Sequence, residues 1–282
     1  MTEPMESRAF ELAVNGRPVH GVVEWAGSGD EARPFVVLVH GFRSSHSWGF
    51  FPELACRLVS AGFVCARFSM SGSGMSSDGT TFENPELFSR NTYSNELEDL
   101  AAVREHLCSG EYPVDPERGA VLGHSRGSGI ALIHAAEVEG LRAVVGWATI
   151  VQAASWTEPK KARWHERGIH RVVAPNGEPI ELALDILEDA ERNRERLDMP
   201  AVARKTKTST LLVHGTEDEG IALEAIRGLY RQFPPCVARL VEIGGAGHNF
   251  GVRHPMGDVP EVLELAIGAT IPMLVSSCRP AS

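Results

Sequence analysis

Near the middle of the chain the sequence reads Val121-Leu122-Gly123-His124-Ser125-Arg126-Gly127-Ser128-Gly129. Apolar residues lead into this Gly-x-Ser-x-Gly pattern, and the run at residues 130–136 that follows it is typical of a helix. The order therefore predicts a strand, a sharp turn and a helix, with the Ser125 hydroxyl exposed at the tip of the turn. Gly123 and Gly127 are expected to be small because the strand and the helix pass close together there.

The pentapeptide alone also occurs by chance, so its alternative interpretation is a glycine-rich turn with an inert serine. A catalytic interpretation needs a base, an acid and two donors for a developing oxyanion. The backbone N–H of Arg126 is the first candidate donor, because it stands at the start of a helix and points the same way as the Ser125 hydroxyl.

The composition is that of a globular chain with a sizeable core. Of its residues 43% are hydrophobic and 23% are charged, an ordinary globular balance. A length of 282 residues fits one large α/β domain spanning residues 1–282, with two small domains as the alternative. The formal net charge of -10 argues against nucleic acid as the main partner. Five scattered cysteines form no close metal-type pair, which favours a reducing, cytoplasmic setting and no bound metal.

No membrane segment is expected. Residues 1–6 carry no apolar signal core. The apolar stretch at residues 265–275 contains Pro272 and is too short to cross a bilayer.

The N-terminal part of the chain predicts a hairpin and then a buried strand. Residues 10–14 and 19–25 alternate apolar and polar side chains around Asn15-Gly16, a strong hairpin signal, and residues 27–30 are expected to form a loop.

The unbroken apolar run at residues 35–39 is typical of a central strand. It ends in His40-Gly41-Phe42, where a parallel strand delivers its carboxyl end to a site, so the Phe42 N–H is the second candidate oxyanion donor. The alternative is a plain turn, and His40 is expected to be structural.

Strand-like and helix-like runs alternate along the rest of the chain. Strands are expected at residues 63–68, 119–122, 141–149, 210–213 and 238–243, and helices at residues 52–61, 93–107, 223–233 and from 259 onward. The helix at residues 93–107 is expected to carry its acids on the face opposite its apolar one. This order predicts a mostly parallel sheet with helices on both faces and functional loops at the carboxyl ends of the strands.

Residues 150–209 interrupt this alternation and are expected to form a lid or cap at the active-site end. The segment contains a second hairpin at residues 171–180 and a charged helix at residues 184–197. Trp156 and Trp164 are candidates for lining a substrate pocket, with anchoring of the lid as the alternative. A basic, aromatic cluster at residues 156–171 is expected to be a solvated face, with carboxylate binding as its alternative.

The remaining catalytic candidates follow the last two strands. Asp218 comes after residues 210–213, and His248 lies in the glycine-rich loop after residues 238–243. A serine hydroxyl is a poor nucleophile at neutral pH and needs a base that an acid orients, so Ser125, His248 and Asp218 are the predicted triad. Glu217 and Glu219 compete with Asp218 as the acid. His254 is the alternative base.

Together these motifs resemble the α/β-hydrolase superfamily over nearly the whole chain. The matching segments are His40-Gly41-Phe42, Gly123-His124-Ser125-Arg126-Gly127, His214-Gly215-Thr216-Glu217-Asp218 and Gly247-His248. Within the superfamily the short lid and the elbow look most like small bacterial carboxylesterases of the cinnamoyl/feruloyl esterase and dienelactone-hydrolase-like groups. The chain departs from the family at Ser69, where relatives often carry an acid.

The resemblance implies an α/β-hydrolase fold and a serine hydrolase that cleaves small-molecule carboxylic esters without a metal or organic cofactor. A peptidase, thioesterase or acyltransferase is the alternative, because it would use the same triad. A cofactor-free haloperoxidase would use the same catalytic groups. A non-catalytic binding protein on this fold is a further alternative, although such a protein is expected to lose a triad member. The sequence does not define the acyl and alcohol groups or the oligomeric state.

Overall fold

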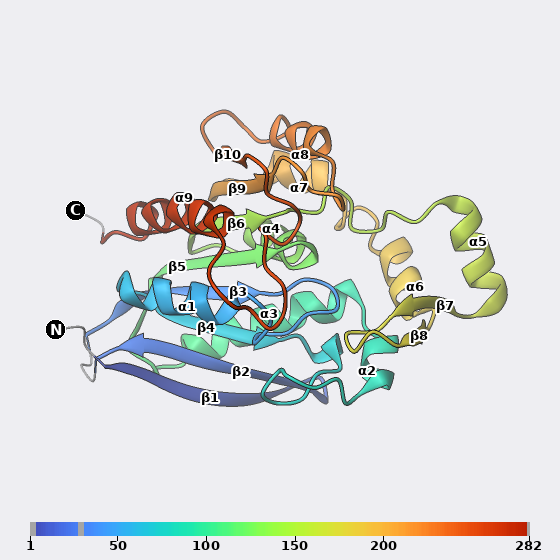
Figure 1. The fold of residues 1–282 in the computed structure, drawn as a ribbon, viewed down its shortest axis with the longest axis horizontal. Helices are drawn as coiled ribbons and strands as arrows, with labels where there is room; N and C mark the ends of the chain where they lie inside the picture. The colour runs from blue at the N-terminus through green and yellow to red at the C-terminus, as the bar shows by residue number, and fades with distance from the viewer. Residues whose placement is uncertain (1–3, 28–30, 281–282) are drawn as a thin grey trace.

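The computed structural model describes residues 4–27 and 31–280, and these residues form an eight-stranded sheet (Figure 1). In spatial order the strands are β1 (Met5–Val14), β2 (Arg17–Ala26), β4 (Val64–Ser69), β3 (Arg33–Val39), β5 (Val114–His124), β6 (Leu141–Trp147), β9 (Ser209–Gly215) and β10 (Ala238–Ile243). β2 pairs antiparallel with β1 and β4, and every pairing from β4 to β10 is parallel. This confirms the predicted mostly parallel α/β sheet.

Asn15 and Gly16 join β1 to β2 in a tight turn. Both have positive φ, 49° and 79°, as this type of turn requires. The strands pair from Val14 and Arg17 outward, so the predicted hairpin is confirmed. The loop expected at residues 27–30 lies, apart from Gly27, outside the described residues.

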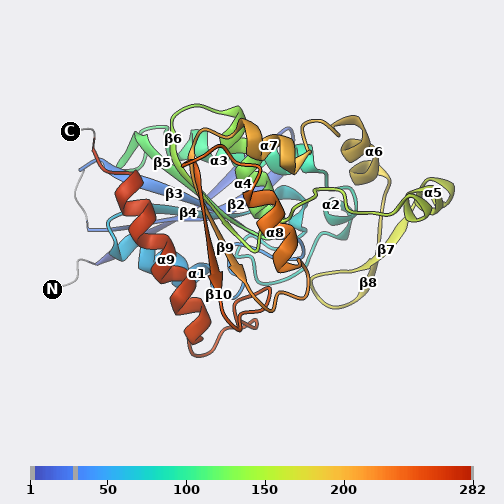
Figure 2. The same ribbon diagram turned by 90° about the horizontal axis from the view of Figure 1, so that it is seen from above.

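Helices cover both faces of the sheet (Figure 2). On one face lie α1 (Phe51–Ser60) and α9 (Glu261–Ser277). On the other lie α3 (Tyr93–Leu107), α4 (Arg126–Glu137), α7 (Met199–Lys205) and α8 (Leu223–Tyr230). In the described part of the chain no helix is both long enough and apolar enough to cross a membrane.

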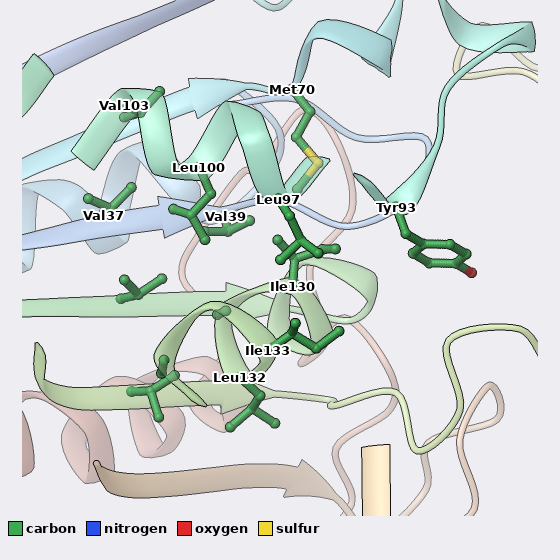
Figure 3. Packing of buried hydrophobic residues seen from close by; sticks show 14 of the residues in the cluster. Val37, Val39, Met70, Tyr93, Leu97, Leu100, Val103, Ile130, Leu132 and Ile133 are labelled. Carbon is green, nitrogen blue, oxygen red and sulfur yellow. The ribbon is translucent and has the colours of Figure 1, made fainter. Parts of the chain in front are cut away.

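Strand β3 shows why both faces are apolar. Val36 and Leu38 belong to the core under α1 and α9, whereas Val37 and Val39 belong to the core under α3 and α4. Successive side chains of a strand point to opposite faces, so an unbroken apolar run supplies both cores. Figure 3 shows the second core, in which Val37 and Val39 lie near the α3 side chain of Leu100.

Helix α3 has the predicted bounds, but of its four acids only Glu98 and Glu105 are exposed as expected. Glu96 and Asp99 are buried, with 2% and 0% of their surface exposed. Both carboxylates find donors that are distant in sequence: Arg126 for Glu96, and Ser71 for Asp99. A buried acid is tolerated when it is hydrogen-bonded and paired, and such partners are not visible in the helical pattern.

The predicted insertion at residues 150–209 follows β6, ends at the first residue of β9, and contains α5 (Glu158–Arg167), β7 (His170–Val173), β8 (Pro179–Leu182), α6 (Asp185–Arg192) and α7. Strands β7 and β8 pair antiparallel, which confirms the second hairpin. This insertion extends beyond the carboxyl ends of the parallel strands (Figure 1). The short elements η1 (Ser71–Ser73) and α2 (Pro85–Ser89) lie at the same end.

The charged helix expected at residues 184–197 is shorter in the structure. It ends at Arg192, because the side-chain amide of Asn193 donates to Asp189 and Ser94 instead of continuing the helix. Asparagine often competes with the helical backbone in this way.

Candidate active site

Ser125 lies between the end of β5 and the start of α4, at the turn that the sequence predicts. Its backbone has φ 54° and ψ -120°, a conformation that residues with side chains rarely adopt and that costs about 1–3 kcal/mol. The Ser125 N–H donates to the Trp147 carbonyl at 2.8 Å, and Ser128 Oγ donates to the Ser125 carbonyl at 2.6 Å. Strand β6 and helix α4 therefore hold the strained turn in place.

Three glycines allow the chain to approach this turn closely. A Cβ on Gly123 would lie 2.2 Å from the Gly127 carbonyl oxygen, and one on Gly127 would lie 2.3 Å from the His40 carbonyl oxygen. A Cβ on Gly41 would lie 3.1 Å from Ser125 Cβ. The expected crowding at Gly123 and Gly127 is thus confirmed, and Gly41 brings the loop after β3 against Ser125.

Ser125, His248 and Asp218 form a continuous hydrogen-bonded chain. His248 Nε2 lies 3.0 Å from Ser125 Oγ, and His248 Nδ1 lies 2.9 Å from Asp218 Oδ2 and 3.1 Å from Oδ1. The competing acids Glu217 and Glu219 are exposed, and a Glu219 carboxylate oxygen lies 3.5 Å from the backbone N–H of His248 and not against its ring nitrogens. The geometry places Asp218, and not its neighbours, against the imidazole.

His254, the alternative base, lies in a different environment. Its Nδ1 accepts a hydrogen bond from the Gly49 N–H at 3.0 Å, and its ring stacks on Trp48. The structure therefore brings His248, and not His254, to Ser125.

The Asp218 carboxylate is held by more than the imidazole. Its Oδ1 accepts hydrogen bonds from the backbone N–H groups of Gly220 and Ile221, both at 2.8 Å. Burial alone would raise the pKa of Asp218, but the bond from His248 and these two N–H groups outweigh it and lower the pKa below its ordinary value. Asp218 therefore stays ionised and can stabilise a protonated His248.

Two neighbouring histidines have neutral, fixed side chains. His124 Nε2 donates to the His248 carbonyl at 3.0 Å, and burial lowers the pKa of His124 to about 3. His40 donates to the Gly41 carbonyl and accepts from the Met70 N–H, and burial lowers its pKa to about 4. The structural role expected for His40 fits these bonds, whereas the support that His124 gives to the His248 loop has no signal in the sequence.

The two candidate oxyanion donors lie beside the serine. Phe42 lines a cavity together with Ser125, and Arg126 directly follows Ser125 at the first position of α4. Within residues 4–27 and 31–280, neither backbone N–H has a hydrogen-bond acceptor. The first N–H groups of a helix have no partner in the helix itself, which explains the unpaired Arg126 N–H, whereas Phe42 lies in a loop that gives its N–H no partner.

Ser125 and His248 lie at the junction of two cavities of about 430 Å³ each. The hairpin cavity is bounded by the loop after β3 and by the tip of the β7–β8 hairpin, including Val173 and Pro175. Among its lining residues in the described chain Arg43 is the one with a permanent charge, and none is Asp or Glu. The sequence shows the hairpin but not that its tip reaches the serine, because that depends on the path of the whole insertion.

The second cavity, which we call the α8 cavity, lies toward the start of α8. Its lining residues are mostly apolar or small: Ile150, Val151, Gln152, Ser155, Gly220, Ile221, Ala222 and Ala225, together with Ser125 and His248. An apolar lining favours a hydrocarbon group of a ligand over a charged one.

Trp156 and Trp164 line neither cavity. Their rings pack edge to face at 5.1 Å, Trp164 also contacts the His170 ring at 4.8 Å, and Trp164 is buried. The structure does not bring these two residues to the cavities beside Ser125: Trp164 is buried within the insertion and Trp156 is partly buried against it. This packing fits the alternative interpretation, in which the two tryptophans anchor the lid.

The basic cluster of the insertion pairs with local acids at an exposed surface. Lys161 bonds Glu158, His165 contacts Glu191 and Arg171 bonds Glu181. These contacts fit the solvated-face interpretation. In the described part of the chain no three His, Cys, Asp or Glu side chains are grouped to hold a metal ion.

A model of the alpha/beta hydrolase family matches residues 36–263. The chain belongs to this family. The match runs from β3 into α9 and includes the turn at Ser125, the insertion and the loops of Asp218 and His248. A search of curated protein sequences found no match to this α/β hydrolase.

Solved structures of esterases share the fold of this α/β hydrolase. Est1E from Butyrivibrio proteoclasticus is 18% identical, with a TM-score of 0.68 over 95% of this chain and 98% of that one. The esterase domain of a Rhodothermus marinus protein is 16% identical, with a TM-score of 0.65 over 98% and 100%. A dienelactone hydrolase from Anabaena variabilis is 17% identical, with a TM-score of 0.62 over 98% and 99%. Another structure of Est1E contains bound ferulic acid. These similarities confirm the predicted α/β-hydrolase fold.

Proposed function

We propose that this α/β hydrolase cleaves small-molecule carboxylic esters through a covalent acyl-serine intermediate. The observation that carries the proposal is the chain of hydrogen bonds from Ser125 Oγ through His248 to Asp218, at 3.0 Å and 2.9 Å, on a strained turn. A serine hydroxyl becomes a useful nucleophile when a positioned base takes its proton, and an ionised acid keeps that base in the required tautomer.

In the first half-reaction Ser125 Oγ attacks the ester carbonyl carbon while His248 Nε2 takes the hydroxyl proton. The carbonyl π electrons move to oxygen and form a tetrahedral oxyanion. When this intermediate collapses, the bond to the alcohol oxygen breaks and His248 gives its proton to the departing alcohol. The acyl group remains on Ser125.

In the second half-reaction water takes the place of the serine hydroxyl. His248 removes a proton from water as the water oxygen attacks the acyl carbon. Collapse of the second tetrahedral intermediate breaks the bond to Ser125 Oγ, which recovers its proton from His248. The acid product leaves, and Asp218 stabilises the imidazolium in both halves.

The N–H groups of Phe42 and Arg126 are the proposed oxyanion donors. Both lie beside Ser125 and neither has another acceptor among the described residues. Such preorganised donors act on the transition state, and losing one typically costs ~100- to 1,000-fold in rate. The mechanism requires neither a metal nor an organic cofactor.

The two cavities are the proposed sites for the two halves of the ester. The apolar α8 cavity suits a hydrocarbon or aryl acyl group. The hairpin cavity, with Arg43 and no carboxylate among its described lining residues, suits a neutral or anionic alcohol group better than a cationic one. Residues 150–209 act in this proposal as a lid, because the tip of their hairpin borders the hairpin cavity.

We also propose a reducing, cytoplasmic setting for the enzyme. All five cysteines of the sequence are unpaired thiols, and two of them, Cys65 and Cys278, are buried. Disulfides are rare in that compartment.

A rate panel tests the proposed ester chemistry. The substrates are p-nitrophenyl esters of rising acyl length, methyl ferulate, and matched thioesters and anilides. We expect the wild-type protein to cleave esters, and Ser125→Ala to lose ~1,000-fold or more in kcat/KM. Ser155→Ala is the matched control, because Ser155 also lines the α8 cavity but, among the described residues, His248 bonds the Ser125 hydroxyl and not that of Ser155.

Labelling with a fluorophosphonate, read by mass spectrometry, completes the test. A modified Ser125 together with ester turnover supports the proposal. A labelled Ser125 with turnover of only thioesters or anilides overturns the ester assignment but keeps the triad. Neither turnover nor label would favour a non-catalytic binding protein.

A further inference from the structure

The side chain of Arg126 is largely buried beside the proposed oxyanion donors. Its guanidinium carbon lies 4.2 Å from the centroid of the Phe42 ring and 5.2 Å from the centroid of the Tyr93 ring. A guanidinium nitrogen lies 3.4 Å from Glu96 Oε1, and the two paired side chains are 12% and 3% exposed. The proposed mechanism uses only the backbone N–H of Arg126, so this side chain has no role in it.

Burying an ion pair is expensive, and an apolar pair of similar size often serves stability equally well. Here the ion pair is connected to the two residues that carry the oxyanion donors. Arg126 carries one donor on its own backbone, and its guanidinium covers the ring of Phe42, which carries the other. A planar guanidinium is well suited to this arrangement because it stacks on an aromatic face while its edge bonds a carboxylate.

We propose that the Arg126 side chain, held by Glu96, is a positioning residue that fixes the Phe42 backbone N–H toward the oxyanion. The proposal rests on the proposed function of the site. It assigns no direct contact with substrate to the guanidinium. Its role is to tie the loop after β3 to the start of α4, so that two donors from different elements converge on one point.

The loop that carries Phe42 needs such a tie. Gly41 precedes Phe42, and glycine restrains the backbone less than any other residue. Arg43 follows with a positive φ of 61° and an exposed side chain. The Phe42 ring lies under the Arg126 guanidinium and stacks on the Phe88 ring at 5.4 Å, and the Arg43 guanidinium carbon lies farther away, at 5.8 Å from its centroid.

Glu96 is itself held in place. The side-chain amide of Asn91 donates to Glu96 Oε1 at 2.7 Å, while Oε2 has no partner among the described residues. Burial raises the pKa of Glu96, and the Arg126 guanidinium opposes that rise. Tyr93, which supplies the second ring near the guanidinium, donates its hydroxyl proton to the Ala153 carbonyl in the insertion. The Arg126 side chain is thus enclosed by groups that have partners of their own.

The test compares Arg126→Met with a second, largely buried ion pair, whose arginine contacts the loop after β3 at the His46 carbonyl, at 3.0 Å, and not at Phe42. Arg67 and Glu24 bond at 2.8 Å with side chains 13% and 8% exposed, so Arg67→Met is the matched control. We expect Arg126→Met to lower kcat by about 100-fold, the typical cost of a catalytic group displaced by about 1 Å, with KM changed less than about threefold. Arg67→Met is expected to lose stability and keep kcat.

Two further variants separate position from charge. Arg126→Lys keeps the positive charge but loses the planar stacking surface. Glu96→Gln keeps the shape of the carboxylate but loses its charge. If the role is positioning, kcat of Arg126→Lys stays closer to that of Arg126→Met than to that of the wild type on a logarithmic scale. Glu96→Gln is expected to lower kcat by about tenfold or less. Full rescue by Arg126→Lys would overturn positioning by stacking. These variants also serve if Arg126→Met does not fold.

A readout without turnover keeps this test independent of the proposed function. With selective ¹⁵N-phenylalanine labelling, the order parameter of the Phe42 N–H is expected to fall in Arg126→Met and to stay unchanged in Arg67→Met. An unchanged order parameter with kcat within about threefold of wild type would overturn the proposal. If the wild-type protein cleaves no ester, the proposed function fails, and the Phe42 order parameter still decides whether Arg126 fixes this loop.

Discussion

Trp147 and Trp164 are both almost completely buried, at 0% and 1% exposure, but one lies in the sheet and the other in the insertion. Trp147, at the end of β6, contacts the rings of Phe50 and Phe250 at 5.3 Å and 5.2 Å. Its indole N–H donates to Thr270 Oγ1 at 3.0 Å. These partners come from three distant parts of the chain, so Trp147 joins the elements on which the triad stands.

Trp164 is held mainly by its own segment. The rings that contact it, Trp156 and His170, lie within a few residues of it along the chain. Its indole N–H has no acceptor among the described residues, which is a cost for a buried donor. The sheet thus fixes the chemical groups through long-range packing, whereas the ring contacts of Trp164 stay within the insertion that borders the site.

Asp218→Asn is expected to have the largest effect. It tests whether the loop after β9 supplies a catalytic group. Asp218→Asn removes the charge that holds the His248 tautomer while keeping the shape of the side chain, so kcat should fall ~10,000-fold. The free energy of unfolding should change little. Steady-state kinetics with a p-nitrophenyl ester measures the loss. Glu217→Gln and Glu219→Gln are the controls, and a comparable loss in either one would give the acid role to a neighbour.

The two tryptophans themselves give the next largest effect. Trp147→Ala should lower the free energy of unfolding by about 3–5 kcal/mol, because it opens a cavity in the central core. Trp164→Ala should lower the free energy of global unfolding much less, since it loosens a locally packed segment. It should also raise KM more than it lowers kcat. Urea unfolding and steady-state kinetics measure both variants. Equal losses of stability would show that the insertion is as deeply integrated as the sheet.

A pair of glycines sharpens the same contrast on a smaller scale. A Cβ on Gly127 would clash with the His40 backbone at 2.3 Å, whereas one on Gly177, at the tip of the hairpin, would meet nothing within 4 Å. Gly127→Ala should cost about 2–3 kcal/mol through overpacking. Gly177→Ala should cost about 1 kcal/mol or less, from its positive φ of 86° alone. Thermal unfolding of both variants checks this order, and a larger loss for Gly177→Ala would contradict it.

The parts of the site that the sequence predicts are those encoded locally. Ser125, Asp218 and His248 each follow a strand within a few residues, and parallel strands bring their carboxyl ends to one edge of the sheet. An apolar run and the glycine-rich segment after it are therefore enough to place each residue.

The parts that the sequence does not predict depend on distant partners. The helical pattern of α3 predicts that Glu96 faces solvent. Its burial depends on Arg126, which lies 30 residues away along the chain and is not visible in the pattern of the helix. Trp164 is interpreted as a pocket residue, because nothing in residues 150–209 shows which way α5 faces. In both cases packing between segments, and not local pattern, decides the environment of the side chain.

The smallest expected effect concerns buried histidines, which link the stability of the core to pH. His134 on α4 is 3% exposed, and burial together with the nearby charge of Arg104 lowers its pKa from 6.5 to about 4. Between those two values the unfolded chain binds more protons than the folded one. The stability is therefore fully present above about pH 6.5 and is lost as the pH falls toward 4.

Replacing His134 by leucine should remove this dependence. Between about pH 7 and pH 5.5 the wild-type protein should lose about 1 kcal/mol more of its free energy of unfolding than His134→Leu does. His170 of the insertion is the counterpart, because partial burial and the charge of Lys160 also lower its pKa. His170→Leu should change the pH dependence less, since that ring is more exposed than His134. Urea unfolding at the two pH values measures the difference, and a larger effect at His170 would mean that the insertion, and not the core, controls stability in acid.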